Sequence, residues 1–442
     1  MKVLVVGGGG REHALCASLA RREDVDHLFA APGNAGMAEM ATLIPISAGD
    51  VEGLVEFAER ESIDLTVVGP EAPLVAGLAD EMTLRGLPVF GPTSDAARLE
   101  GSKAWAKDLC RRHGIPTAGS EEFEAFDAAM AYVEQLEPPI VVKVDGLAAG
   151  KGVTVAEDHH QAEQALRGAL VNKVFGEAGL KVLVEEYLTG MEVSALALTD
   201  GMTVRPLALA QDFKRAMDGN RGQNTGGMGA FSPLPFVGGD IEARITVDIL
   251  EAVGRALRDE GVEFRGVLFA GVMLTDAGPR VLEFNCRFGD PETQVILPRL
   301  TSDLAGALRA CTNGTLADHE LTWTPQACVG VVVASAGYPG PVQAGRPIAG
   351  LASAAEVDGV QVFHSGTSVR DGQVVTSGGR VLASSSIDAL RLHRSRPMRI
   401  PLGKAGTLRA RVWIPRSAQS GYQARFADVT LDLRATVIKG SR

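Results

Sequence analysis

The sequence lacks the features that would assign it to several other classes of protein. Its five cysteines are scattered and include no Cys-x-x-Cys pair, a pattern typical of neither a disulfide framework nor a zinc site. No apolar run is long enough for a transmembrane helix, and the chain does not open with a signal-peptide pattern. We therefore expect a soluble cytoplasmic protein with no membrane partner.

Positive charge is also scarce. The 442 residues contain 43 Lys and Arg against 54 Asp and Glu, a formal net charge of −11. A general nucleic-acid binder would show a basic face, so we expect no nucleic-acid partner. Small anionic substrates stay compatible with this charge, because they need only a local basic pocket. The composition is otherwise that of a globular protein, and its length predicts about three domains.

A glycine-rich loop follows the first expected strand. A short, largely apolar run at residues 1–6 leads into Gly7–Gly10, and a helical pattern then runs from Arg11 to about Arg22. This order is typical of a parallel α/β sheet, and the loop amides at the helix N-terminus can bind an anion. A dinucleotide-binding fold is disfavoured, because Glu12 stands where its third glycine belongs. His13 can either pack in the helix or act in catalysis.

Two further loops follow expected strands of the same sheet. Asn34 lies in a turn-rich loop after the second strand, and Pro70-Glu71 follows the buried-type strand at 65–68. A similar strand and loop lie at 89–92. Because ligands bind at the carboxyl ends of parallel strands, these loops predict one cleft.

An expected strand near residue 284 carries polar side chains in alternation. Glu283, Asn285 and Arg287 are two residues apart, so they should point to one face. A carboxylate and an amide oxygen suit Mg²⁺, and a guanidinium can hold a phosphoryl group through two hydrogen bonds. On spacing alone, a solvated strand face is an equal alternative.

The residues that follow this strand decide between the two. Residues 287–294 read Arg-Phe-Gly-Asp-Pro-Glu-Thr-Gln. This string resembles the signature of the phosphoribosylamine–glycine ligases, which are ATP-grasp enzymes of purine synthesis. The opening at 7–14, Gly-Gly-Gly-Gly-Arg-Glu-His-Ala, is similar to the opening of the same family, where the loop meets the phosphate of phosphoribosylamine. The resemblance implies an ATP-dependent ligase that joins glycine to 5-phosphoribosylamine.

A second motif lies at residues 138–153. An expected strand ends at Lys143, a small-residue loop contains Gly150 and Lys151, and another strand starts at Val153. Small residues let backbone amides approach phosphates, and lysine adds a compact charge. The Walker phosphate loop does not fit, because a glycine follows Lys151 and no helix is expected there. The stretch resembles the mobile ATP-grasp hairpin, with a plain glycine hairpin as the alternative.

The resemblance also implies an ATP site. A lone lysine or glutamate is by default a solvated charge. In the family, however, the lysine at the position of Lys103 faces the nucleotide, and the backbone of a hinge segment contacts the edge of the adenine. An acid after the hinge takes the ribose hydroxyls. The implied ATP-binding residues are Lys103, Lys143, Gly150, Lys151, Glu185, Glu186, Tyr187, Leu188 and Glu192.

The stretch at 211–229 is rich in glycine and charge, with little periodicity. We expect a long functional loop there, in which Asp212, Lys214 and Arg215 suit a zwitterionic amino acid and a phosphate. The family often has Asp where this chain has Asn220. By resemblance, Arg287, Lys214 and Asp212 are catalytic. The implied substrate-binding residues are Gly9, Gly10, Arg11, Glu12, Asn34, Pro70, Glu71, Asn224, Thr225, Gly226, Gly227, Met228, Asp290, Pro291 and Glu292.

Two kinds of cofactor follow from the resemblance, ATP and Mg²⁺ or Mn²⁺. The expected strand at 266–273 lacks the second metal carboxylate of many ATP-grasp enzymes. The cation should therefore rest on Glu283, Asn285, phosphates and water.

The expected fold class is α/β. Residues 1–100 should form an N-terminal parallel α/β domain that binds substrate. Residues 101–190, with the mobile lid, and 191–326, with the metal site, should form the two halves of an ATP-grasp fold. Residues 327–442 should form a small β-rich domain. We expect a monomer.

The resemblance ends at about Leu382. Residues 383–442 hold 12 Lys and Arg but only 3 Asp and no Glu, a net charge of +9 against −20 for the rest. Translation out of the family's reading frame, a genuine basic appendage and simple divergence all explain this change. We favour the first, because the break is abrupt. Sequencing the gene across codons 375–390 tests it, and an intact frame would exclude it.

Two other functions compete with this interpretation. Another ATP-grasp carboxylate–amine ligase or carboxylase would share the lysine hairpin and the Glu-x-Asn strand, but would lack Arg-Phe-Gly-Asp-Pro-Glu. Alternatively, the chain binds ATP but is inactivated by its atypical tail.

Overall fold

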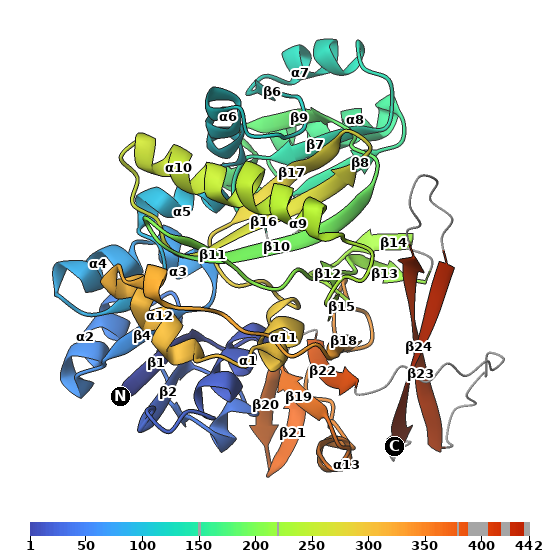
Figure 1. Cartoon of the computed structure of the whole chain (residues 1–442). Helices are drawn as coiled ribbons and strands as arrows, with labels where there is room; N and C mark the ends of the chain where they lie inside the picture. The colour runs from blue at the N-terminus through green and yellow to red at the C-terminus, as the bar shows by residue number, and fades with distance from the viewer. Residues whose placement is uncertain (149–151, 219–220, 378–379, 388–404, 417–424, 437–442) are drawn as a thin grey trace.

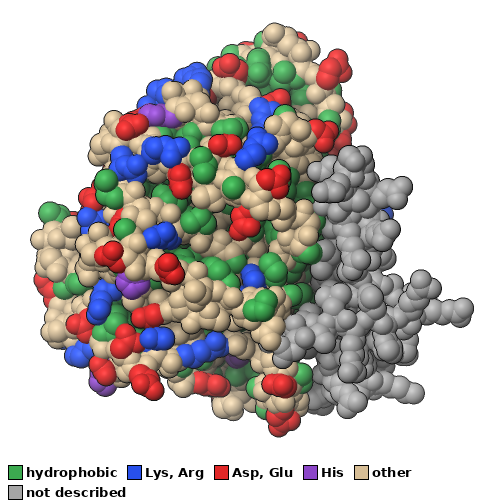
Figure 2. All heavy atoms as spheres, in the orientation of Figure 1, with side chains coloured by type: hydrophobic (Ala, Val, Ile, Leu, Met, Phe, Trp, Pro, Cys, Tyr) green, Lys and Arg blue, Asp and Glu red, His purple; other side chains and the backbone are tan. Residues whose placement is uncertain are grey.

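The computed structural model describes all residues except 149–151, 219–220, 378–379, 388–404, 417–424 and 437–442. Gly150, Lys151 and Asn220 therefore lie outside the described residues. Figure 1 shows an N-terminal α/β layer, two further sheets above it and a β-rich part beside it. On the face seen in Figure 2, acidic and basic side chains are interspersed among apolar ones. Among the described helices, none is long and apolar enough to cross a membrane.

The N-terminal part is a five-stranded parallel sheet in the order β3-β2-β1-β4-β5. Residues Val3–Val6 of its central strand are fully buried, as their continuous apolar run predicts. From β1 the chain first adds strands on one side of the sheet (β2, β3) and then on the other (β4, β5). The loops after β1 and β4 therefore lead away from each other and leave room for a ligand between them. The elements are β1 (Lys2–Gly7), α1 (Gly10–Leu19), β2 (His27–Pro32), β3 (Thr42–Leu43), α2 (Val51–Glu61), β4 (Leu65–Val68), α3 (Glu71–Val75), α4 (Leu78–Leu84), β5 (Val89–Phe90) and α5 (Ser94–Gly101).

The next part is an antiparallel sheet in the order β6-β9-β7-β8. Two of its helices cover the sheet and share with it a separate hydrophobic cluster that includes Val142, Leu166 and Val184. The strands expected on either side of the lysine hairpin are confirmed. The elements are α6 (Lys103–His113), β6 (Ser120–Phe123), α7 (Phe126–Val133), β7 (Ile140–Val144), β8 (Val153–Ala156), α8 (His159–Leu166) and β9 (Val182–Glu186).

A second antiparallel sheet, in the order β11-β10-β16-β17, carries the Glu-x-Asn strand at its edge. Figure 1 shows α9 and α10 lying across one face of this sheet. Its long central strands are almost wholly buried. The elements are β10 (Met191–Asp200), β11 (Val204–Pro206), α9 (Gly239–Arg244), α10 (Glu251–Asp259), β16 (Arg265–Thr275) and β17 (Gly278–Asn285).

A third sheet, in the order β12-β15-β18-β22-β19, joins strands from both sides of residue 326. The prediction of a long loop at 211–229 is wrong in part, because short strands form there and β13 pairs with β14. The elements are β12 (Gln211–Asp212), β13 (Arg215–Met217), β14 (Arg221–Asn224), β15 (Gly229–Ser232), α11 (Thr293–Ile296), α12 (Leu304–Asn313), β18 (Ala327–Ala334), α13 (Leu351–Ala355), β19 (Val360–His364), β20 (Thr367–Arg370), β21 (Gln373–Thr376) and β22 (Arg380–Ile387).

The basic C-terminal stretch contains one antiparallel pair within its described residues. Strand β23 (Ala405–Arg416) pairs with β24 (Arg425–Thr436) along its whole length. The overall class is the expected α/β one: a parallel N-terminal sheet, antiparallel sheets beyond it and a small β-rich part.

Candidate active site

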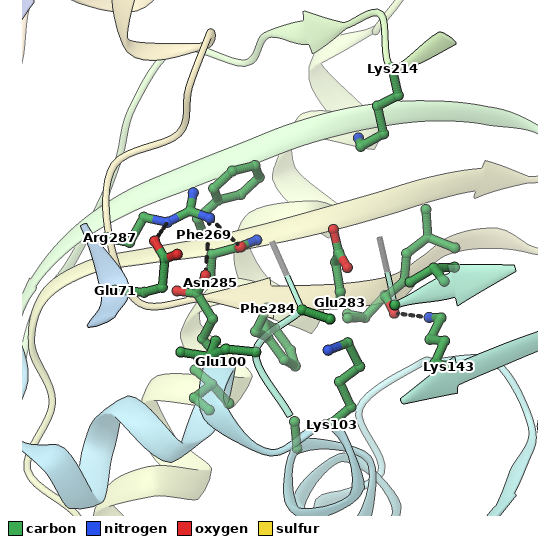
Figure 3. Close-up of a pocket in the computed structure, with 18 of the residues that line it drawn as sticks. Glu71, Glu100, Lys103, Lys143, Lys214, Phe269, Glu283, Phe284, Asn285 and Arg287 are labelled. Atoms are coloured by element: carbon green, nitrogen blue, oxygen red, sulfur yellow. Dashed lines mark hydrogen bonds and ion pairs between the residues drawn. The ribbon is translucent and has the colours of Figure 1, made fainter. Parts of the chain in front are cut away.

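A cavity of about 310 Å³ lies where the N-terminal sheet meets the two antiparallel sheets. Glu283 and Asn285 of β17, and Arg287 just after it, all line this cavity. Figure 3 shows Glu283 between a group formed by Arg287, Asn285 and Glu71 on one side and Lys143 on the other.

Arg287 connects three parts of the chain. Its guanidinium donates to Glu71 of α3 at 3.3 Å, to Glu100 of α5 at 3.0 Å and to Oδ1 of Asn285 at 2.9 Å. Burial alone would lower the pKa of Arg287, but the carboxylates of Glu100 and Glu71 raise it above its ordinary value. The guanidinium is therefore a fixed positive charge.

Three lysines approach the same cavity from different elements (Figure 3). Lys103 Nζ donates to the carbonyl of Gly146 at 3.1 Å, and Lys143 Nζ donates to the carbonyl of Leu282 at 2.8 Å. Burial would raise the pKa of Glu283, but Lys214, Lys143 and Lys103 together lower it. Glu283 is thus held ionised at the centre of a cationic ring.

A buried ion-pair group closes the end of the cavity next to α6. Glu185 Oε2 accepts from Lys143 at 3.0 Å and from Lys107 at 3.1 Å, and Lys107 also donates to Thr117 at 2.8 Å. Glu185 is 2% exposed, and its Oε1 is buried without a hydrogen-bond partner among the described residues. A buried carboxylate with one free oxygen can accept a hydrogen bond from a ligand.

Carboxylates gather around Lys214 at the opposite side. Its Nζ contacts Glu192 at 2.6 Å and Asp212 at 2.9 Å. Ser194 donates to Glu292 Oε1 at 2.9 Å. Burial, and then the charge of Asp212, raise the pKa of Glu292 to about 7. This carboxyl therefore titrates near neutral pH.

Comparisons with known proteins agree over most of the chain. Models of phosphoribosylglycinamide synthetase match residues 1–100 (N domain), 101–293 (ATP-grasp domain) and 328–392 (C domain). The chain belongs to this family. Members of the phosphoribosylglycinamide synthetase family are ATP-dependent ligases.

Individual relatives support the assignment to the synthetase family. The phosphoribosylamine–glycine ligase of Pseudomonas aeruginosa is 49% identical over 390 residues, which cover 88% of this chain and 90% of that protein. The same enzyme from Halalkalibacterium halodurans is 49% identical over 383 residues, or 86% and 88% of the two chains. The crystal structure of the Thermotoga maritima enzyme superposes with a TM-score of 0.76 at 31% identity, covering 88% of this chain and 93% of that one.

The structure brings many residues implied by the synthetase resemblance to one cavity, and places others elsewhere. The cavity-lining ones are Arg11, Glu71, Lys103, Lys143, Glu185, Asp212, Lys214, Thr225, Gly226, Glu283, Asn285, Arg287, Asp290 and Glu292. The described residues that do not line it are Gly9, Gly10, Glu12, Asn34, Pro70, Glu186, Tyr187, Leu188, Glu192, Asn224, Gly227, Met228 and Pro291.

Two of these outlying residues hold loops in place through their side chains. Glu12 accepts from the Gly9 amide at 2.6 Å and from Arg11 at 2.6 Å. A β-carbon on Gly69 would lie 2.2 Å from Oε1 of Glu12, which explains the glycine there. Asn34 donates to the carbonyls of Gly8 and His364, at 3.0 and 2.8 Å.

His13 also has a packing role in the structure. Its Nδ1 accepts the backbone N–H of His364 at 2.9 Å, and its ring stands edge-on to Phe363. Burial, and then the neighbouring His364, lower the pKa of His13 to about 3. His13 is therefore neutral at physiological pH and accepts a hydrogen bond between α1 and β19.

Sequence reasoning missed Lys107. It lies four residues after Lys103 on α6, a spacing that places both on one helix face, and this signal could have identified it. Its partner Glu185 is 78 positions away in the chain, so no local sequence pattern could have predicted the ion pair.

Replacement of Asn34 tests its role in holding the loops. Asn34→Ala leaves the buried carbonyl of His364 and the amide of Gly36 without their partner, at a cost of about 2 kcal/mol. We expect the melting temperature to fall by a few degrees in a thermal unfolding experiment. Asn34→Asp keeps the acceptor oxygen but loses the donor, so its melting temperature should lie between those of wild type and Asn34→Ala. An unchanged melting temperature with a changed substrate KM would contradict this role.

The raised pKa of Glu292 predicts a pH-dependent cost to stability. Because its folded-state pKa is about 7 against an ordinary 4.5, folding binds the proton more tightly, and stability is lost as pH rises from about 4.5 to 7. Glu292→Gln keeps an acceptor for Ser194 without the charge. We expect it to be more stable than wild type by about 3 kcal/mol at pH 8 and nearly equal at pH 4.5.

Melting temperatures of both proteins across this pH range measure the effect. Glu23→Gln removes an exposed carboxylate and controls for the loss of one negative charge. The same difference at every pH would contradict the assignment.

Proposed function

We propose that this chain joins glycine to 5-phosphoribosylamine in purine biosynthesis. ATP is split to ADP and phosphate, and the product is glycinamide ribonucleotide. The observation that carries this proposal is the meeting of Lys103, Lys143, Lys214 and Arg287 around Glu283 in one cavity of a phosphoribosylglycinamide synthetase chain. The P. aeruginosa relative named phosphoribosylamine–glycine ligase supports it.

In this reaction the glycine carboxylate takes the γ-phosphoryl group of ATP and becomes an acyl phosphate. The amine of phosphoribosylamine then displaces the phosphate and forms the amide. Phosphoryl transfer needs positioning and charge neutralisation more than a protein nucleophile. Lys143 and Arg287 supply positive charge from opposite sides of the cavity (Figure 3). Lys103 adds a third cationic group from α6, although burial lowers its pKa below the ordinary value.

The metal donors that this mechanism needs are on β17. Among the described residues, the side chain of Glu283 has no hydrogen-bond or ion-pair partner, and Asn285 Oδ1 accepts only one bond, from Arg287. These oxygens fit a hard divalent cation, Mg²⁺ or Mn²⁺. Within the described part of the chain, no group of three or more His, Cys, Asp or Glu could hold a metal, so phosphates and water complete the shell. The bound cation would offset phosphate charge.

The other ATP contacts in the proposal come from the two ATP-grasp halves. Gly150 and Lys151, which lie outside the described residues, would contact the triphosphate, and the backbone from Glu185 to Leu188 would contact the adenine edge. The side chain of Glu186 is already engaged by the Gly119 amide at 2.8 Å and by Arg280 at 2.8 Å, which leaves its backbone for this task. Glu192 takes the ribose hydroxyls.

The proposed division of labour follows the four expected parts. Residues 1–100 hold phosphoribosylamine, 101–190 and 191–326 enclose ATP, and 327–442 close the cleft. We also propose a cytoplasmic monomer. All five cysteines are free and buried, which fits a reducing compartment.

Removal of the central carboxylate tests the metal assignment. Glu283→Ala should abolish turnover, by at least about 1,000-fold, because the phosphate charge loses its bound cation. The fold should stay intact, because the Glu283 side chain makes no hydrogen bond or ion pair among the described residues, but the melting temperature should fall by a few degrees, because the surrounding lysines lose the negative charge they stabilise. Retention of most of the activity at saturating Mg²⁺ would contradict the assignment.

The activity itself is tested by ADP release from Mg·ATP, glycine and freshly generated phosphoribosylamine, with each omitted in turn. We expect release only when all three are present. Release without glycine or phosphoribosylamine would point to another ATP-grasp ligase. Binding of ATP without any release would favour the inactive ATP-binding protein.

A further inference from the structure

Lys107 of α6 is a buried lysine whose hydrogen-bond acceptors are all protein groups. Only 9% of its surface is exposed. Its Nζ has three acceptors: Oε2 of Glu185 at 3.1 Å, Oγ1 of Thr117 at 2.8 Å and the carbonyl of Ala118 at 3.3 Å. Burial lowers the pKa of Lys107, and the charge of Glu185 opposes this shift. Because an ammonium group has three N–H donors, the three acceptors fit the protonated form.

Lys143 differs from Lys107 in the number of its acceptors. Its Nζ donates to Oε2 of Glu185 at 3.0 Å and to the carbonyl of Leu282 at 2.8 Å (Figure 3), and the described residues offer it no third acceptor. Both lysines line the cavity. Lys143 therefore has one N–H available for a phosphate oxygen, whereas all three donors of Lys107 are already used.

The two lysines share one carboxylate oxygen. Oε2 of Glu185 accepts from both ammonium groups, and Glu185 is 2% exposed. These three side chains form a buried group with two positive charges and one negative charge. Without the charge of Lys107, Glu185 would pair with Lys143 alone, and the pair would be neutral. Because charges are weakly screened in a buried site, this change would reduce the attraction of Lys143 for a phosphate.

The buried group is also fixed to the strand that carries Glu283. Oγ1 of Thr117, which accepts from the buried lysine of α6, donates to the carbonyl of Val281 at 2.8 Å. The carbonyl of the next residue, Leu282, accepts from Lys143. The hydrogen bonds of the group thus end on the two residues that precede Glu283. Lys143, from one half of the ATP-grasp fold, is therefore held in a fixed place beside the proposed metal donor of the other half.

We propose that Lys107 is a positioning residue for phosphate binding. It balances the charge of Glu185, so that Lys143 keeps its positive charge and one N–H for a phosphate of ATP. This inference rests on the proposed function, in which Lys143 offsets phosphate charge. Lys107 itself does not contact the nucleotide. A purely structural role, in which Lys107 only holds Thr117 and Ala118 in place, would respond differently to a second charge change at Glu185.

Removal of the charge of Lys107 is the first test. Lys107→Met keeps the apolar stem and removes the ammonium group. In calorimetry with Mg²⁺ and a non-hydrolysable ATP analogue, we expect the dissociation constant to rise about 10- to 100-fold, as for loss of a charge-assisted hydrogen bond. The kcat/KM for ATP should fall in proportion. Binding as tight as that of wild type would overturn the proposal.

A second charge change distinguishes charge balance from a structural role. Adding Glu185→Gln to Lys107→Met removes the carboxylate and restores the net positive charge of the group. The double variant should bind the ATP analogue at least about fivefold more tightly than Lys107→Met, because the two changes compensate each other. It still lacks the hydrogen bonds to Thr117 and Ala118, so a structural role predicts no recovery. Absence of recovery would overturn the proposal.

Lys107→Gln covers the case in which Lys107→Met is too unstable to measure. It removes the charge but keeps two N–H donors for Thr117 and Ala118. We expect it to weaken binding of the ATP analogue and to recover when Glu185→Gln is added. Tight binding by Lys107→Gln alone would overturn the proposal, because the hydrogen bonds and not the charge would then matter.

Adenosine separates an effect on the phosphates from an effect on the base. It carries adenine and ribose but no phosphate. Measured by displacement of the same ATP analogue, the dissociation constant of adenosine should stay within about twofold of wild type in Lys107→Met. Equal weakening of adenosine and the ATP analogue would overturn the proposal, since Glu185 would then act on the base through its free Oε1.

Lys181→Met is the matched control for loss of a positive charge. Lys181 directly precedes β9 of the same sheet and pairs with Glu122 at 3.4 Å, with 34% of its side chain exposed. We expect binding of the ATP analogue and turnover to stay at the level of wild type. A loss equal to that of Lys107→Met would overturn the proposal, because a general loss of positive charge would then explain both.

The proposed function and the role of Lys107 fail in different ways. If wild type releases ADP without glycine or phosphoribosylamine, the proposed function is wrong. If wild type requires both and Lys107→Met binds the ATP analogue as tightly as wild type, the function stands and only the role of Lys107 is wrong.

Discussion

The positive charge of Arg287 is the constraint on which the arrangement of the site depends. A buried guanidinium is tolerated only where carboxylates and carbonyls surround it. Here Glu71 comes from the N-terminal domain and Glu100 from the helix that leads out of it, while Asn285 comes from the edge of the ATP-grasp sheet. The pairing therefore aligns the loops of the N-terminal sheet with the strand that carries Glu283 and Asn285. Removal of Arg287 would take this cation away from both Glu71 and Glu100 at the junction.

A second set of contacts connects strand β19 to the loops of the N-terminal sheet. The backbone N–H of His364 donates to His13, and its carbonyl accepts from Asn34, which also donates to the glycine loop at Gly8. Both histidines are neutral because burial lowers the pKa of each. The glycine loop is thus held between the N-terminal sheet and β19, and its amides are fixed in place before any substrate binds. This fits catalysis by preorganised charge, since the protein does not have to reorganise around the phosphates.

Patterns short enough to be read along the chain predicted the fold and the centre of the site. Alternation placed Glu283, Asn285 and Arg287 on one face, and the order of strand, loop and helix predicted the parallel sheet. The rest depends on pairs far apart in the chain. Lys107 with Glu185, and Asn34 with His364, have no local signature, because each is defined by where two elements meet in space. For Asn34, a turn residue after a strand resembled a substrate contact, and the partner that explains it lies 330 residues away. The hairpin of β13 and β14 was missed because its glycines and charges hide the strand pattern.

The third sheet shows why the end of the chain matters to the active site. Asp212 lies on β12, which pairs with β15, which pairs with β18, which pairs in turn with β22. Strand β22 spans Arg380–Ile387, the point where the resemblance found in the sequence ends, and it lies wholly within the C-domain match that extends to residue 392. In this chain β22 pairs with β18 along Arg380–Ile387, so the ladder from β22 to Asp212 is complete among the described residues. The change in sequence after Leu382 therefore falls within a strand that still supports β18, and the strand that carries Asp212 keeps its place beside the cavity.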